Sequence, residues 1–339
     1  MREKSKTQIT LIILVLTALG LFLANRYLDP YKIRIINLSG IYVTLGLSMN
    51  LINGMTGMFS LGHAGFMAIG AYTVGILTMP VTMKEMNFFM QPIVPFLANV
   101  EWGFLPALFA AGLIAAFFGI LIGAPVLRLT DDYLAIATLG FAEIIRVVFT
   151  NTQSLTNGAL GLKGIPNYTN IWWSWGVALV TVWFIWFLMK GTYGKAFLAI
   201  REDEIAARSM GINLFKHKVM SFAFGCFFAG VAGGLMAGML GTIDPNMFRI
   251  TLTFNILLIV VLGGLGQIGG TIISAVIVTV MMEALRFLDE AMDLGFVQIK
   301  GIPGMRMVVF SIILIIVVII REKGLVRRPK GRELTYAKN

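Results

Sequence analysis

Residues 190–218 read KGTYGKAFLAIREDEIAARSMGINLFKHK, the longest hydrophilic stretch in the chain that has apolar segments on both sides. It contains six Lys/Arg residues and three consecutive acids, Glu202, Asp203 and Glu204. On a helix, residues three and four apart share a face, so Ala206 lies above Met210 and Ala207 above Gly211. The stretch therefore predicts a short helix with a small, smooth face beside a charged turn.

Two interpretations of this stretch remain open from its residues alone. A small face suits docking into a groove on another protein, because small side chains let backbones approach closely while charges at the rim fix the orientation. The alternative is an ordinary basic cytoplasmic loop that only orients the membrane spans around it.

The composition of the chain identifies the kind of protein that surrounds this loop. Hydrophobic residues make up 58% and charged residues 13% of the 339 positions, and the mean hydropathy is +0.85. Soluble domains have about 25% charged residues. We therefore expect an all-α polytopic integral membrane protein. In a soluble protein the net charge of +10 would suggest nucleic acid, but here the position of charges in membrane loops explains it.

Ten apolar runs are long enough to cross a hydrocarbon core of about 30 Å. They are residues 9–24, 35–53, 58–79, 104–127, 133–150, 172–189, 219–240, 251–268, 270–288 and 304–320. This predicts a transmembrane domain over residues 1–320, with the 190–218 loop inside it, and a basic tail over 321–339. The first run follows the basic start MREKSK, but no small-residue cleavage site follows it, so we interpret it as a span.

The distribution of basic residues favours a cytoplasmic location for both chain ends. With the N-terminus inside, seventeen Lys/Arg residues fall on the cytoplasmic side and nine fall in or near the external loops. Cytoplasmic loops carry an excess of Lys and Arg, so this bias predicts an N-in, C-in topology with the 190–218 loop and the tail inside.

Two glycine-rich breaks interrupt the predicted spans at their cytoplasmic ends. They are NGMTG at 53–57, which precedes a glycine-rich third span, and GGLGQIGG at 263–270. Unpaired backbone at membrane depth must be shielded by protein or by a water-filled cavity, so such breaks indicate a transport pathway. The candidate pathway residues are Asn50, Asn53, Gly57, Ser60, Gly62, His63, Gly65, Gly263, Gly264, Gly266 and Gln267. The alternative is tight helix packing through small residues.

Few ionisable residues fall inside the spans. Glu143 and Arg146 lie three apart, as do Glu283 and Arg286, so each pair can partly neutralise itself. They are candidates for a contact with a zwitterionic solute or for a gate, and the alternative is a self-paired anchor at a helix end. His63 has no acid near it in sequence, which favours a packing or hydrogen-bonding role over a proton relay.

Several catalytic motifs are absent from the sequence. There is no GxxxxGK[ST] phosphate loop, no CxxC and no HExxH, and the lone Cys226 lies in an apolar span. We therefore assign no catalytic residue, no metal site and no cofactor to this chain. If it pumps, either an ion gradient drives it or a separate ATPase acts on the 190–218 loop.

Five runs of sequence carry a resemblance to a known family. The run GKAFLAIREDEIAARSMGIN at 194–213 resembles the cytoplasmic loop of the permease subunits of branched-chain amino acid ABC transporters, the LivM type. Four further runs resemble that family's signature blocks in the expected order. They are NLINGMTGMFSLGHAGFMAIGAY (50–72), LRLTDDYLAIATLGFAEIIR (127–146), LTNGALGLKGIP (155–166) and VLGGLGQIGG (261–270). The likeness covers about residues 35–320.

The resemblance implies a transport subunit of an ATP-driven importer in the bacterial cytoplasmic membrane, and not an enzyme. It implies a second, related permease as partner, two cytoplasmic ATPase subunits that hold ATP and Mg, and an extracytoplasmic binding protein that delivers Leu, Ile or Val. The 190–218 loop then matches the ATPase-docking loop, whose pattern is EAA-x-x-x-G. The docking residues carried over or placed beside that pattern are Glu202, Asp203, Glu204, Ala206, Ala207, Met210 and Gly211.

This sequence departs from the docking pattern at one position. Ile205 stands where the pattern has Glu, and Glu204 precedes it by one residue, so which acid reaches the ATPase stays open. Two other functions also stay open. One is a permease of the same architecture for urea or short amides, and the other is an ion-coupled secondary transporter that uses Glu143, Arg146 or His63.

Overall fold

The computed structural model describes residues 20–24, 26–129, 131–288, 292–293, 298–299, 305, 308–309 and 311–312. Five of its helices are long and apolar enough to cross a membrane. They are α2 (Pro30–Met49) with its π-helical extension η1 (Asn50–Met55), α6 (Phe104–Val126), α7 (Asp131–Asn151), α9 (Ile171–Lys190) and α12 (Leu214–Leu240). Three shorter apolar helices are α3 (His63–Thr78), α13 (Ile250–Gly263) and α14 (Ile268–Ala284).

These eight helices coincide with eight of the ten predicted spans, which confirms an α-helical, multi-pass membrane protein. The other two predicted spans, 9–24 and 304–320, lie largely outside the described residues, and the tail 321–339 lies entirely outside them. At about 1.5 Å per residue, the shorter helices are less than 30 Å long, and each of them begins or ends at a glycine-rich break.

The remaining described elements are short and lie in the connections between the long helices. They are α4 (Val81–Asn87), α5 (Pro95–Ala98), α8 (Gln153–Thr156), η2 (Gly158–Leu160), α10 (Thr192–Glu202), α11 (Glu204–Ser209), η3 (Pro245–Phe248), η4 (Leu285–Leu288), β1 (Leu162–Lys163), β2 (Thr242–Ile243), β3 (Met292–Asp293) and β4 (Gln298–Ile299). The strands form two antiparallel pairs, β1 with β2 and β3 with β4.

Glycines allow α12 to lie at the centre of the bundle, between α3 and α6. A Cβ on Gly70 of α3 would overlap the backbone of Gly230 on α12, and a Cβ on Gly230 would lie 2.7 Å from the Ala111 carbonyl oxygen of α6. Small residues therefore bring three backbones into direct contact, as in membrane helix interfaces generally. The helix α2 also contacts α12, and it packs against α9 and α14.

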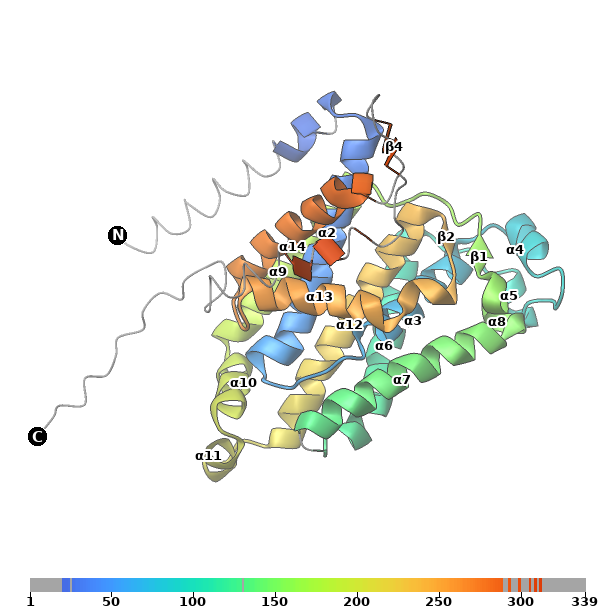
Figure 1. Ribbon diagram of the computed structural model, residues 1–339. Helices are drawn as coiled ribbons and strands as arrows, with labels where there is room; N and C mark the ends of the chain where they lie inside the picture. The colour runs from blue at the N-terminus through green and yellow to red at the C-terminus, as the bar shows by residue number, and fades with distance from the viewer. Residues whose placement is uncertain are drawn as a thin grey trace, which may run out of the picture.

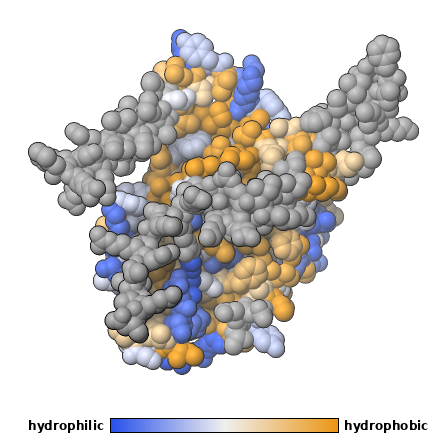
Figure 2. Space-filling model, turned by 60° about the vertical axis from the view of Figure 1, so that its left-hand side comes forward, coloured by the Kyte–Doolittle hydropathy of each residue, from blue (hydrophilic) through white to orange (hydrophobic). Residues whose placement is uncertain are grey.

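The outer faces of the peripheral helices are apolar. On α6, Phe109 and Phe117 are well exposed, and on α9 so are Trp183 and Phe187. Hydrophobic residues also cover much of the surface that is visible in Figure 2. Such surfaces are unfavourable in water and are expected where lipid is the solvent.

The connections gather at two opposite ends of the bundle (Figure 1). At one end lie α10 and α11, and at this end Arg128, which follows α6, lies 5.2 Å above the Phe215 ring at the start of α12. At the other end lie α4, α5 and α8 with the β1–β2 pair. The connections after α6 and α9 lie at one end and those after α3, α7 and α12 at the other, as expected if each long helix crosses the bundle.

At the end that carries α4, two polar side chains link the connecting segments through hydrogen bonds. Asn87 accepts a hydrogen bond from the Lys163 backbone nitrogen (2.9 Å) and donates one to the Lys163 carbonyl oxygen (2.7 Å). The buried Lys84 ammonium donates to the Leu97 and Val100 carbonyl oxygens beside the C-terminus of α5. Burial lowers the pKa of Lys84, and the nearby Glu101 carboxylate acts in the opposite direction. The connection that contains α4 and α5 is therefore held in shape and tied to the connection that contains β1.

Replacing Gly230 by Val should prevent this packing, because a side chain there would meet Ala111 and Ala115 of α6, and the Gly230 backbone already lies against Gly70 of α3, so α12 has little room to move away. Overpacking of a well-packed interior costs about 1–3 kcal/mol, and backbone contacts leave little room to relax. We expect a large loss of monodisperse protein in detergent size-exclusion chromatography. Gly176→Val on α9 is the matched control, since no atom lies within 4 Å of its added Cβ. Equal yields for the two variants would contradict this packing.

Candidate functional site

The first glycine break begins as a distortion of the helix that precedes it. Over η1 the helix widens to π geometry, and the Thr56 backbone nitrogen donates to the Leu51 carbonyl oxygen at 3.2 Å. The chain then runs without regular structure to Gly62, and the Asn53 side chain closes this segment through two hydrogen bonds to the backbone of Ser60 (3.1 and 3.3 Å). The break is thus an ordered loop held by its own polar residues.

The second break is a tight turn between the antiparallel helices α13 and α14. Gly264 and Gly266 have φ angles of +92° and +78°, which glycine adopts without steric cost. A Cβ on Gly263 would lie 2.6 Å from the carbonyl carbon of Gly270, so the end of α13 and the start of α14 are in backbone contact. Only residues without a side chain allow this turn.

Asn50 joins the two breaks. Its Oδ1 accepts a hydrogen bond from the Gly266 backbone nitrogen (2.8 Å), and its Nδ2 donates to Thr271 Oγ1 (2.7 Å) and to the Gln267 carbonyl oxygen (3.2 Å). Asn50 is fully buried, and a Cβ on Gly54 would overlap the Gly266 nitrogen. We call this contact between η1 and the α13–α14 turn the glycine junction; its residues are Asn50, Gly54, Gly57, Gly264, Gly266 and Gln267.

A second group of buried polar contacts lies beside the junction. The His63 Nε2 and Ser48 Oγ are 2.7 Å apart, and Thr138 Oγ1 accepts from the Leu61 nitrogen. Thr253 Oγ1 accepts from the Ala64 nitrogen at the start of α3. The hydroxyls of α7 and α13 therefore satisfy backbone donors that the short α3 leaves open.

Many of the residues predicted to line a pathway are engaged in hydrogen bonds or close packing within the protein. Gly62 and Gly65 form the crossing of α3 and α7, since a Cβ on either would lie 2.9 Å from an atom of Thr138 or Ala142. Asn50, Asn53, Ser60 and His63 are all buried and hydrogen bonded. The packing role that we left open for the breaks is thus visible in the structure, and a role in lining a path stays a prediction.

The two predicted charge pairs are formed. Arg146 Nε lies 2.7 Å from Glu143 Oε2, and Arg286 Nη1 lies 3.2 Å from Glu283 Oε1. Glu283 also accepts a hydrogen bond from the Tyr31 hydroxyl (3.0 Å) and lines a cavity of about 230 Å³ with Tyr42, Asn255 and Thr279 among others. Self-pairing reduces the cost of placing these charges within the span region.

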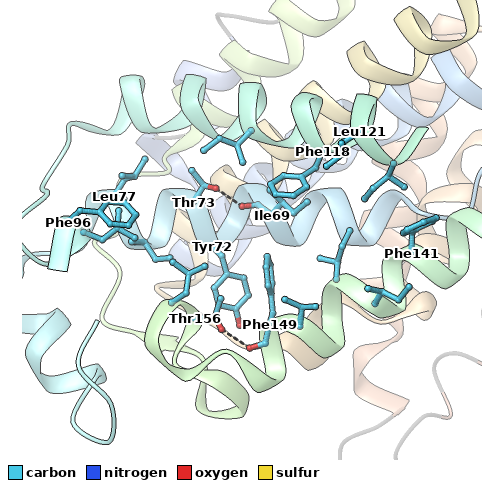
Figure 3. A pocket seen from close by; sticks show the side chains of 18 residues that line it. Ile69, Tyr72, Thr73, Leu77, Phe96, Phe118, Leu121, Phe141, Phe149 and Thr156 are labelled. Carbon is cyan, nitrogen blue, oxygen red and sulfur yellow. Dashed lines mark hydrogen bonds between the residues drawn. The ribbon is translucent and has the colours of Figure 1, made fainter. Parts of the chain in front are cut away.

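An apolar cavity of about 580 Å³ opens between α3, α6 and α7 (Figure 3). Leu77, Phe118 and Phe141 are among its lining residues. Its polar residues are Tyr72, Thr73 and Thr156; both threonine hydroxyls donate to backbone carbonyls, whereas the buried Tyr72 hydroxyl has no hydrogen-bond partner among the described residues. The lining offers aliphatic and aromatic contacts but no charged group for a zwitterion, so by itself it is not a complete amino acid site.

The predicted docking loop forms two helices, α10 and α11, with Asp203 between them. The Asp203 carboxylate caps α11 by accepting from the Ile205 and Ala206 nitrogens (2.8 and 3.0 Å). Glu204 forms an ion pair with the buried Lys218 at the start of α12. These two acids hold the loop in shape, whereas the exposed Glu202 makes only a long ion pair of 3.8 Å with Arg201.

The loop has a small core of its own and an apolar tip. Ala207 is buried against Ile200 and Leu214, so its side chain faces the loop interior and not a partner. Ile205 and Met210 are 80% and 82% exposed. The exposed tip of the predicted docking loop, which we call the docking tip, therefore consists of Ile205, Ala206, Met210 and Gly211, and it includes the residue that departs from the EAA pattern.

Arg201 connects this loop to the glycine junction, a contact that the sequence analysis did not predict. Its Nη1 donates to the Gly54 carbonyl oxygen (2.9 Å), and a Cβ on Gly266 would lie 2.5 Å from the same nitrogen. In the sequence Arg201 is one of six basic residues of the loop, and nothing in their spacing distinguishes it.

Replacing Asn50 by Leu should separate the two breaks, because the Gly266 nitrogen would lose its acceptor, while the Gln267 oxygen and the Thr271 hydroxyl would keep only their bonds within α14. Each unsatisfied buried group costs about 1–3 kcal/mol. We expect the thermal midpoint in detergent to fall by several degrees. The control is Asn255→Leu, since Asn255 has no hydrogen bond within the part of the chain described here. An unchanged midpoint for Asn50→Leu would argue against the junction.

Comparison with known proteins gives matches to permeases. The family model described as "Branched-chain amino acid transport system / permease component" matches residues 31–318. The permease protein LivM of Escherichia coli K12, named for high-affinity branched-chain amino acid transport, is 34% identical over 76% of this chain. A probable LivM of Methanocaldococcus jannaschii is 22% identical over 85% of this chain and 90% of its own length.

More distant similarity extends to an autoinducer 2 import permease, LsrC, from Salmonella paratyphi B, which is 28% identical over 49% of each chain. The chain spans 64% of the length of the E. coli LivM. No solved structure matches this chain. Because the family model covers most of the chain and two LivM permeases are 34% identical to it, this protein belongs to the family of branched-chain amino acid transport system permease components.

Proposed function

We propose that this chain is a permease subunit of an ATP-driven ABC importer that carries branched-chain amino acids across the bacterial cytoplasmic membrane. The exposed docking tip is the observation that carries the proposal. Two large apolar side chains, Ile205 and Met210, project from a polar loop that leaves the apolar bundle (Figure 1). Exposed apolar groups rimmed by charges mark protein contact sites, and here the contact is with an ATPase subunit.

The proposed topology has ten spans with both chain ends in the cytoplasm, residues 1–320 forming the permease domain and 321–339 a cytoplasmic tail. The excess of Lys and Arg on the side that carries the 190–218 loop supports this orientation. The end that carries α4 would then face outward, where a binding protein delivers the solute. A second, related permease and two ATPase subunits complete the assembly.

The substrate proposal rests on the family and on the relatives' printed names, which point to branched-chain amino acids. The apolar lining of the cavity beside Tyr72 is compatible with aliphatic side chains. Selectivity would rest mainly with the binding protein, because the described spans offer few charged groups that are free of an internal partner. The energy for transport comes from the partners' preference for one of two permease conformations.

An ion-coupled secondary transporter remains the second candidate. The contacts of the residues it would use weigh against it, because Glu143 is paired with Arg146 and His63 with Ser48. Within the described residues, no group of three or more His, Cys, Asp or Glu side chains could hold a metal ion. A carrier of this kind would import solute without an ATPase.

The transport proposal is tested by uptake into proteoliposomes that contain this chain with its second permease, ATPase and binding protein. We expect accumulation of labelled leucine that requires ATP and persists when an ionophore removes the ion gradient. Labelled urea should not accumulate in the same vesicles. Preferential urea uptake would favour the short-amide alternative, and gradient-driven uptake by the chain alone would reject the importer.

The docking proposal is tested with a charge placed at the apolar tip. Ile205→Asp or Met210→Asp should weaken ATPase binding by at least about tenfold, because apolar anchors dominate such contacts and a buried unpaired charge is costly. Thr192→Asp, at the far end of α10, is the control with the same charge change, and an acid is favourable at a helix N-terminus. Unchanged ATPase capture by both tip variants would exclude this surface.

A further inference from the structure

The side chain of Arg201 fills a slot whose walls are glycines from both breaks. Its Nη1 donates to the Gly54 carbonyl oxygen at 2.9 Å and lies against Gly266. A Cβ on Gly57 would lie 3.0 Å from Arg201 Cγ, so the third wall also has no space for a side chain. One arginine from the docking loop therefore touches the backbone of both breaks at the point where Asn50 joins them.

Charge makes this contact stronger than a neutral hydrogen bond. Gly54 lies in the last turn of the 26-residue helix formed by α2 and η1, where helix carbonyls point outward and the helix dipole is negative. A guanidinium at such an end is favourable, and its donors are planar and fixed in direction. Arg201 is largely buried. Its Nη2 lies 3.8 Å from Glu202 Oε1, whereas its Nη1 lies 2.9 Å from the Gly54 carbonyl oxygen, so the carboxylate is the weaker partner.

The helix that carries Arg201 is also packed firmly to both sides. Phe197 is fully buried in a cluster that contains Leu51 and Met55 of η1. One turn away, Ile200 packs on Ala207 of α11. Buried side chains thus link the docking tip to α10 and α10 to the junction. Such contacts transmit displacement, because protein interiors are close-packed.

We propose that Arg201 is the positioning residue that couples movement of the docking loop to the glycine junction. This inference rests on the proposed function, in which an ATPase moves the loop. When α11 shifts, α10 shifts with it, and the guanidinium draws the Gly54 carbonyl and the α13–α14 turn in the same direction. Both breaks therefore move as one unit, and the helices α3, α13 and α14 that begin or end at them change their tilt.

The test is the number of leucine molecules imported per ATP hydrolysed in the reconstituted importer. We expect Arg201→Ala to keep the ATPase bound and hydrolysing while this ratio falls about tenfold, since a charge-assisted hydrogen bond is lost. Arg201→Lys restores the charge and one donor but not the planar fork, so an intermediate ratio is expected. Lys195→Ala, which removes a charge from an exposed position of α10, should leave the ratio unchanged.

Each outcome decides between the two proposals. If the wild-type assembly shows no ATP-dependent uptake, the importer itself is wrong. If wild type transports and Arg201→Ala keeps the wild-type ratio, the coupling role is rejected while the importer stands. Loss of ATPase binding in both Arg201 variants would also reject it, because Arg201 would then belong to the docking surface. If Arg201→Ala does not fold, the ratio for Arg201→Lys decides in the same way.

Discussion

The rest of this fold depends on one constraint. The backbones of Gly54 and Gly266 lie in close contact, which is possible because both residues are glycines. Gly54 and Gly266 approach so closely that a Cβ on Gly54 would overlap the other chain segment, and the buried Asn50 side chain holds the two segments together through three hydrogen bonds. Backbone groups at membrane depth must be satisfied within the protein. The junction meets that requirement where regular helices end, and it allows α3, α13 and α14 to be short.

The same arrangement connects the membrane region to the predicted partner side. Packing of glycines against α3 and α6 fixes α12, and α12 begins at the end of the docking loop, where Lys218 pairs with Glu204. The loop is therefore attached to the bundle through Lys218, Arg201 and Phe197. A loop anchored in this way moves with the bundle and does not flex independently, which is what energy transfer from a separate ATPase requires.

Much of this could be predicted from the sequence because it depends on patterns that are local. Apolar runs gave eight of the described helices, and the spacing of Glu143 with Arg146 gave an ion pair that is present. The contact of the two breaks could not be predicted, since Asn50 and Gly266 are 216 residues apart and no pattern in one chain connects them. The burial of Ala207 was missed for a related reason, because the EAA pattern records residue type and not which face of α11 packs on Ile200.

The most direct measurement is a pair of structures of the assembled transporter by electron cryomicroscopy, one without nucleotide and one with ATP trapped in the ATPase subunits. The account predicts that α10, α11 and both glycine breaks shift together between the two states, with the contact from Arg201 to the Gly54 carbonyl kept. A loop that moves with its ATPase while the glycine junction stays fixed relative to α12 would contradict it.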